Sequence, residues 1–287
     1  MKSIQFNYPG YDDATLTGYL LDCAIPLGQE EKRPAVIVCP GGGYIYCSDA
    51  EGEPVALRYA ASGYHAFVLR YSTGPRAAGF APLKQLSWAI GLLRENADEW
   101  KIDPERIVVC GFSAGGHLAL SSGLLAENKP NAMVLGYPAT SAPIIPGMDF
   151  MLKFLTGKEK PTDEDAAHFD LVPQITKEAP PVFMMATAED ALTPFGALAV
   201  AKKYSEVGLD YELHIFQHGP HGYSLADHTS AAGSRRYLNP EFAKWFELSV
   251  AWIQKTLGKP EFVDKSNSKM AKYLMEMGIN LRGFQGE

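Results

Sequence analysis

Short apolar segments alternate with segments of helical periodicity along most of the chain. The apolar segments predict strands over Leu16–Leu21, Ala35–Cys39, His65–Leu69, Ile107–Cys110, Ala132–Gly136, Val182–Ala186 and Tyr211–Phe216. The segments between and after them predict helices over Pro54–Ser62, Leu83–Trp100, Ala114–Ala126, Phe195–Val207 and Pro240–Lys255. Strands that are apolar throughout indicate a mostly parallel sheet with helices on both faces. The expected fold class is α/β, with ligands bound at the carboxyl ends of the strands.

Two segments depart from this alternation. Residues 140–181 are rich in proline and carry only a short helical stretch around Asp149–Leu155, so we expect a small cap-like excursion over the sheet edge. In the tail, Met270, Tyr273, Leu274 and Met277 share one face of a predicted helix that ends near Gly278. The chain is therefore expected to form a domain over residues 1–258 and a C-terminal helical extension over 259–287. The apolar stripe of the extension must pack on its own domain or on a partner chain, so a homo-oligomer is possible.

Composition supports one large globular domain and narrows the range of partners. The 287 residues are 46% hydrophobic and 21% charged, which is enough apolar material for a sizeable core. The formal net charge is −7 and the sequence contains no long run of Lys or Arg. We therefore expect a neutral small-molecule ligand and no nucleic-acid partner.

The N-terminal residues and the cysteines bear on the expected compartment. The first ten residues lack the apolar core of a signal peptide, and no segment is apolar for the length of a membrane span, so we expect a cytoplasmic protein without membrane contact. The cysteines, Cys23, Cys39, Cys47 and Cys110, form no C-x-x-C motif. Reduced thiols are therefore expected, with no disulfide and no zinc site.

Gly111-Phe-Ser-Ala-Gly115 matches the pattern G-x-S-x-G directly after a predicted strand and before a predicted helix. That context is the one in which a serine on a tight strand-to-helix turn presents its hydroxyl above the sheet. The helix N-terminus behind it favours developing negative charge. We therefore interpret Ser113 as a nucleophile, although an N-cap serine in a glycine-rich turn would give the same pattern.

A serine nucleophile needs a base and a carboxylate that orients the base, and two later strand ends offer them. The loop after Val182–Ala186 contains Glu189 and Asp190, and the loop after Tyr211–Phe216 contains His218 and His221. The order serine, acid, histidine is the one that α/β-hydrolase folds require.

His221 is the favoured base among the seven histidines, which are His65, His117, His168, His214, His218, His221 and His228. Pro220 and Gly222 flank it in a free loop, whereas His218 directly follows the strand end. A metal site made of His214, His218 and His221 is a weak alternative, because the first of these lies on a strand and no cysteine completes the set.

The glycine-rich segment Pro40-Gly-Gly-Gly-Tyr44 follows the strand Ala35–Cys39. Backbone N–H groups of Gly42 or Gly43, together with that of Ala114, are the expected oxyanion hole for the charge that acyl transfer places on a carbonyl oxygen. A phosphate-binding loop is not indicated, because neither Gly-Lys-Ser/Thr nor G-x-G-x-x-G is present. A glycine-rich turn without a ligand is the other reading. Near these loops, Tyr44, Phe112 and Tyr223 are the expected substrate contacts, with Tyr46 and Phe195 as further aromatic neighbours.

The chain resembles α/β-hydrolase serine esterases of the group that includes acetyl xylan esterases and BD-FAE-like carbohydrate esterases. The residues that carry the resemblance are Val38–Tyr44, Glu51–Ala56, Gly63–Tyr64, Val68–Tyr71, Ile107–Ala119, Ala188–Asp190 and Gly219–Gly222. Pro40 stands where related esterases often have a histidine. The resemblance implies Ser113 as nucleophile, Asp190 as orienting acid and His221 as base.

The resemblance also implies hydrolysis of short acyl esters, acetate above all, on sugars or xylo-oligosaccharides, without a cofactor or metal. Two alternatives of other classes remain open. One is a serine peptidase of the prolyl oligopeptidase type, which usually carries an additional large domain. The other is a non-catalytic binding protein with a hydrolase-like fold, which would normally have lost one of the three side chains.

Overall fold

An eight-stranded sheet forms the centre of the molecule in a computed structural model that describes residues 1–22, 32–140, 149–193, 195–258 and 269–278. The strands are β1 (Lys2–Asn7), β2 (Thr15–Leu20), β3 (Arg33–Cys39), β4 (His65–Arg70), β5 (Ile102–Phe112), β6 (Ala132–Gly136), β7 (Val182–Thr187) and β8 (Tyr211–Phe216). Their order in the sheet is β1-β2-β4-β3-β5-β6-β7-β8. The β1–β2 and β2–β4 pairs are antiparallel and the pairs from β4 to β8 are parallel, which confirms the predicted α/β class.

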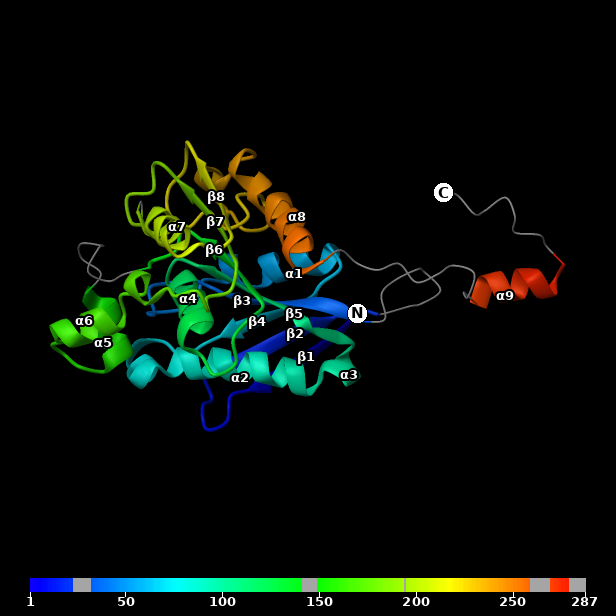
Figure 1. The fold of residues 1–287 in the computed structure, drawn as a ribbon, viewed down its shortest axis with the longest axis horizontal. Helices are drawn as coiled ribbons and strands as arrows, with labels where there is room; N and C mark the ends of the chain where they lie inside the picture. The colour runs from blue at the N-terminus through cyan, green and yellow to red at the C-terminus, as the bar shows by residue number, and fades with distance from the viewer. Residues whose placement is uncertain (23–31, 141–148, 194, 259–268, 279–287) are drawn as a thin grey trace.

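Helices cover both faces of this sheet. They are α1 (Glu53–Ala61), α2 (Ala81–Glu95), α3 (Ala97–Trp100), α4 (Ala114–Leu125), α5 (Asp149–Thr156), α6 (Asp163–His168), α7 (Gly196–Val207), α8 (Trp245–Leu257) and α9 (Lys269–Glu276). Figure 1 shows α1 and α8 on one side of the sheet and α2 and α3 on the other. The burial of β3, β6 and β7 along their whole length follows from this double cover.

The seven predicted strands are all present, and the predicted helices recur. The helix predicted over Pro240–Lys255 begins later, at Trp245, after a 3₁₀ turn. The helix predicted over Leu83–Trp100 is two helices, because the chain breaks at Asn96, whose side-chain amide donates to the carbonyl of Leu92. Strand β1 was missed, because it lies at the sheet edge and alternates between half-buried and exposed side chains.

The predicted cap-like excursion contains α5 and α6 in its described part. Helix α5 contacts the 3₁₀ segment η3 (Gly74–Phe80), and α6 begins with a capping box in which Thr162 and Asp165 bond each other's backbone N–H. Residues 141–148 lie outside the described residues. The short helix expected around Asp149–Leu155 is α5.

The predicted C-terminal helix is α9, which Figure 1 shows apart from the sheet. The side chains of Tyr273 and Met277 are 61% and 60% exposed, so they do not pack on the described part of the domain. Packing of this helix on a partner chain stays a prediction. Among the described residues, we find no helix with the length and apolar content of a membrane span. Cys39, Cys47 and Cys110 are unpaired, and Cys23 lies outside the described residues.

Candidate active site

Ser113 stands alone between the end of β5 and the start of α4. Its backbone has φ 52° and ψ −116°, a conformation that costs energy for a residue with a Cβ. The flanking glycines permit this turn: a Cβ at Gly115 would lie 2.1 Å from the carbonyl oxygen of Cys39, and one at Gly111 would lie 2.1 Å from that of Gly115. The G-x-S-x-G pattern is therefore a steric requirement of this turn.

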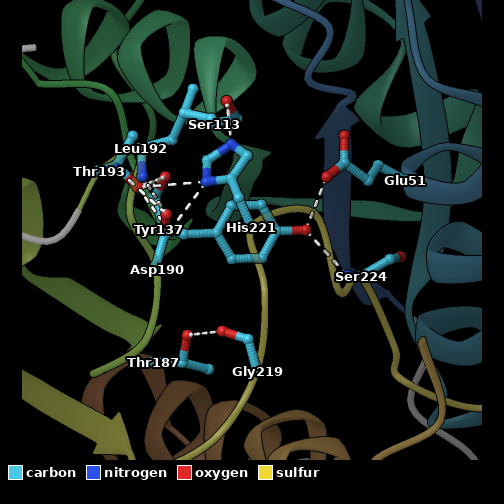
Figure 2. Close-up of polar contacts among 10 residues, drawn as sticks. All are labelled: Glu51, Ser113, Tyr137, Thr187, Asp190, Leu192, Thr193, Gly219, His221 and Ser224. Atoms are coloured by element: carbon cyan, nitrogen blue, oxygen red, sulfur yellow. Dashed lines mark hydrogen bonds and ion pairs between the residues drawn. The ribbon is translucent and has the colours of Figure 1, made fainter. Parts of the chain in front are cut away.

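Three side chains from separate strand ends meet beside this turn, as Figure 2 shows. The Nε2 atom of His221 lies 2.8 Å from the Oγ atom of Ser113, and its Nδ1 atom lies 2.8 Å from Oδ2 of Asp190. Asp190 follows β7 and His221 follows β8, which are neighbours in the parallel part of the sheet. The structure thus brings together the serine, acid and histidine that the sequence predicted.

Asp190 is held as a carboxylate by a dense set of donors. It is 2% exposed, and its Oδ1 accepts the backbone N–H groups of Leu192 and Thr193 at 2.8 and 3.1 Å. Burial by itself would raise the pKa of Asp190, but the hydrogen bond and charge of His221, with the donations from Thr193, hold that pKa below its ordinary value. A carboxylate only accepts, so the hydrogen of His221 sits on Nδ1 and the lone pair of Nε2 faces the hydroxyl of Ser113.

The glycine loop predicted as an oxyanion hole lies next to Ser113. Gly42 has φ +122°, and a Cβ there would lie 2.2 Å from the carbonyl oxygen of Tyr46, so only glycine fits. The carbonyl of Gly42 accepts the N–H groups of Ile45 and Tyr46, which fixes the turn. Ala114 opens α4, where N–H groups have no partner within the helix.

A pocket of about 450 Å³ opens above Ser113 and His221. Gly42 and Gly43 line it on one side, and its apolar walls are Ile45, Tyr46, Phe150, Leu192 and Tyr237. Phe150 comes from α5, so the cap-like excursion contributes to the pocket. The arrangement can hold a small acyl group over the hydroxyl of Ser113 with a larger moiety among aromatic side chains.

The three aromatic residues expected to contact substrate lie in the core instead. Tyr44 is buried, and its hydroxyl bonds Nδ1 of His117 at 2.9 Å. Phe112 packs on Tyr137 and Trp245, and Tyr223 packs on Phe242 and Tyr237. Their positions beside the loops misled the prediction, because a residue next to a strand end can turn its side chain inward. None of the three lines the pocket.

The remaining histidines within reach of the loops have other partners. His218 bonds Glu189 at 2.8 Å, and both side chains are exposed. His214 on β8 bonds Glu212 at 2.9 Å. His117 on α4 also bonds the carbonyl of Phe169 at 3.1 Å, and burial lowers its pKa to about 4. These contacts separate His221 from the other histidines.

Three further side chains of this site were not predicted. The hydroxyl of Thr193 donates to Oδ2 of Asp190 at 2.8 Å, and the hydroxyl of Tyr137 donates to Oε1 of Glu51 at 2.6 Å. The ring of Tyr137 lies edge-on to the ring of His221, with centroids 4.9 Å apart. Tyr137 directly follows β6, so its place at a strand end was a usable signal. Glu51 begins a segment that carries the family resemblance, but nothing in the sequence indicates that its carboxylate bonds Gly41 and Tyr137.

Comparison with protein families and curated proteins places the chain among esterases. The BD-FAE family model matches residues 21–142. Endo-1,4-beta-xylanase B of Butyrivibrio fibrisolvens is 31% identical over 213 residues, which are 68% of this chain and 33% of that protein. The acetylxylan esterase of Xylanibacter ruminicola is 26% identical over 215 residues, which are 71% of this chain and 43% of that protein. The chain thus spans less than half the length of these two relatives.

Solved structures match over nearly their whole length. An α/β-hydrolase enzyme from a deep-sea metagenome library of the Medee basin is 35% identical with a TM-score of 0.77, and the match covers 90% of this chain and 98% of that one. The acetyl ester-xyloside bifunctional hydrolase from Caldicellulosiruptor lactoaceticus is 31% identical with a TM-score of 0.73, over 86% and 91% of the two chains. With its sheet order and the turn at Ser113, the chain belongs to the α/β-hydrolase family, in the group of the carbohydrate esterases.

Proposed function

We propose that the protein is a serine esterase that removes short acyl groups, acetate above all, from sugars or xylo-oligosaccharides. The observation that carries the proposal is the unbroken chain of two 2.8 Å hydrogen bonds from Ser113 through His221 to Asp190. Such a chain activates a hydroxyl that is otherwise a poor nucleophile.

The reaction has two steps. The Oγ atom of Ser113 attacks the ester carbonyl carbon while its proton passes to Nε2 of His221, and Asp190 stabilises the imidazolium that forms. The N–H groups of Ala114 and of Gly42 or Gly43 bind the oxyanion. Collapse of the tetrahedral intermediate releases the alcohol with the proton of His221, and water then attacks the acyl group on Ser113 by the same route. Carboxylic acid and free serine are the products.

The acetylated-carbohydrate preference rests on the named relatives and on the shape of the pocket. The Xylanibacter ruminicola protein is named an acetylxylan esterase and the Caldicellulosiruptor lactoaceticus structure an acetyl ester-xyloside hydrolase. In the pocket, Tyr46 and Tyr237 offer aromatic faces with polar tips, as sites for sugar rings often do.

Replacement of Ser113 tests the mechanism. We expect Ser113→Ala to lower kcat by on the order of 10⁶-fold on an aryl acetate, because the nucleophile acts as one unit with its base. An organophosphonate should label the wild-type protein at Ser113 and leave the folded variant unlabelled, as intact-mass spectrometry would show. Near-normal turnover by the variant would overturn the serine mechanism.

A substrate panel tests the proposed specificity. Acetate release is measured on acetylated xylo-oligosaccharides, simple aryl acetates and acetylated antibiotics, and a peptide library is included. We expect the highest kcat/KM on the acetylated oligosaccharides. Faster cleavage of peptides would favour a peptidase, and failure of every ester and of the phosphonate would favour a non-catalytic binding protein.

A further inference from the structure

Glu51 is a buried carboxylate beside the proposed site that has no part in the three-residue chain. It is 4% exposed and lies just before α1, in the segment between the glycine loop and that helix. Its Oε2 atom accepts the backbone N–H of Gly41 at 2.8 Å, and its Oε1 atom accepts the hydroxyl of Tyr137 at 2.6 Å. Burying a carboxylate costs free energy, and hydrogen bonds to both oxygens offset that cost. The two bonding partners therefore indicate what the buried Glu51 does in the site.

The first bond fixes the glycine loop against the nucleophile. A Cβ at Gly41 would lie 2.6 Å from Oε2 of Glu51 and 3.0 Å from the Cβ atom of Ser113. Gly41 therefore packs closely between the side chains of Glu51 and Ser113. The next residues in the chain are Gly42 and Gly43, whose N–H groups are the proposed oxyanion donors. The carboxylate of Glu51 therefore sets how far these donors stand from Ser113.

The second bond continues into the loop that carries His221. The backbone N–H of Ser224 donates to the hydroxyl of Tyr137 at 2.8 Å, and the hydroxyl of Ser224 donates to the carbonyl of Ala50 at 2.6 Å. Figure 2 shows the hydroxyl of Tyr137 between Glu51 and Ser224, with its ring beside His221. Two adjacent residues, Ala50 and Glu51, thereby fix the position of the glycine loop relative to the histidine loop.

The hydrogen bonds of Glu51 offset part of the cost of its burial. Burial raises the pKa of Glu51, whereas the donations from Tyr137 and Gly41 and the charge of His221 oppose that rise. The other titratable groups that sense Glu51 are Tyr71, Cys110 and Tyr137, and burial raises the pKa of each, so they stay neutral. The role of Glu51 in the site therefore rests on its two hydrogen bonds, to Gly41 and to Tyr137.

On this basis, and resting on the proposed esterase function, we infer that Glu51 and Tyr137 are positioning residues for the reaction. They align the oxyanion donors with the histidine base. Neither residue exchanges a proton with substrate in this scheme. The pair is a link between two loops that the sequence separates by more than a hundred residues.

Two near-isosteric variants test this alignment. Glu51→Gln keeps one acceptor for Gly41 and replaces the second oxygen by an amide group. Tyr137→Phe removes the hydroxyl that bonds both Glu51 and Ser224. Tyr19→Phe is the matched control, because the Tyr19 hydroxyl makes the same kind of bond, 2.7 Å to Glu53, on the surface. Rates on an aryl acetate are divided by the concentration of sites that react with a phosphonate, so unfolded protein does not count.

We expect both variants to lower kcat per reactive site by about 10²-fold with little change in KM, as expected when oxyanion donors are displaced. Tyr19→Phe should match the wild type.

The outcomes distinguish this inference from the proposed function. If the wild type hydrolyses the ester and Ser113→Ala does not, the proposed esterase mechanism is supported, independently of the results for the Glu51 variant. Unchanged kcat per reactive site in both variants would overturn the role in alignment. If the variants lose phosphonate-reactive sites but keep the wild-type kcat per site, Glu51 and Tyr137 contribute to folding and not to alignment, which would overturn the inference.

Discussion

At the level of single residues, the site contains two adjacent carboxylates and two nearby histidines with opposite environments. Asp190 and His221 are paired at 2.8 Å in a buried position beside Ser113. Glu189 and His218 are also paired at 2.8 Å, but both side chains are exposed to solvent. The two carboxylate–histidine pairs thus have the same separation and differ in burial. The buried pair is the one whose histidine bonds Ser113, at 2.8 Å.

Amide variants of the two carboxylates test this difference. We expect Asp190→Asn to lower kcat by about 10⁴-fold, because an amide donor facing Nδ1 favours the tautomer of His221 that cannot accept the proton of Ser113. Glu189→Gln, the adjacent and exposed change, should leave kcat near the wild-type value. Steady-state kinetics on an aryl acetate measures kcat of both variants. Equal losses of kcat would contradict the assignment of different roles to Asp190 and Glu189.

At the level of elements, the sequence indicates where strands end better than where side chains point. The sharp turn at Ser113 and the acid and histidine loops were predictable, because each follows an apolar strand and uses residue types with a defined chemistry. Tyr44 and Phe112 were misplaced because inward or outward orientation depends on tertiary packing. The bond between Glu51 and Tyr137 was not predictable, since it joins segments with no shared pattern.

The tight packing of α4 under the glycine loop gives a test at this level. We expect Gly115→Ala to lose activity and several kcal/mol of unfolding free energy, because the new Cβ would lie 2.1 Å and 2.4 Å from the carbonyl oxygens of Cys39 and Pro40. Gly91→Ala in α2 is the control: its Cβ meets only the end of the Asn128 side chain. Urea unfolding should place this control within about 1 kcal/mol of the wild type.

At the level of the whole molecule, the sheet order explains how distant residues converge. Strands β5, β7 and β8 lie in one parallel set with β6 between β5 and β7, so the loops after them emerge at the same sheet edge. The segment after β3 joins them there, because β3 pairs with β5. One edge therefore collects the glycine loop, the serine, the acid and the histidine from four places in the chain.

The same compact core makes stability depend on pH. His117 is buried and burial lowers its pKa to about 4, and burial lowers that of His65 to about 4 as well. Unfolded histidines take up protons near pH 6.5, so the unfolded state binds more protons than the folded state between about pH 6.5 and 4. The stability that these groups contribute is complete above about pH 6.5 and is lost as the pH falls towards 4. For His117 the full loss is on the order of 3 kcal/mol.

A single substitution isolates this contribution. In His117→Gln the amide can still accept the hydroxyl of Tyr44 and donate to the carbonyl of Phe169, but it cannot titrate. Burial raises the pKa of Glu51, which acts with the opposite sign, so the difference between wild type and variant is the informative quantity. We expect the unfolding free energy from urea titrations to fall less steeply in the variant between pH 6.5 and 4. Parallel curves would mean that His117 takes up its proton in the folded state without breaking the bonds to Tyr44 and Phe169.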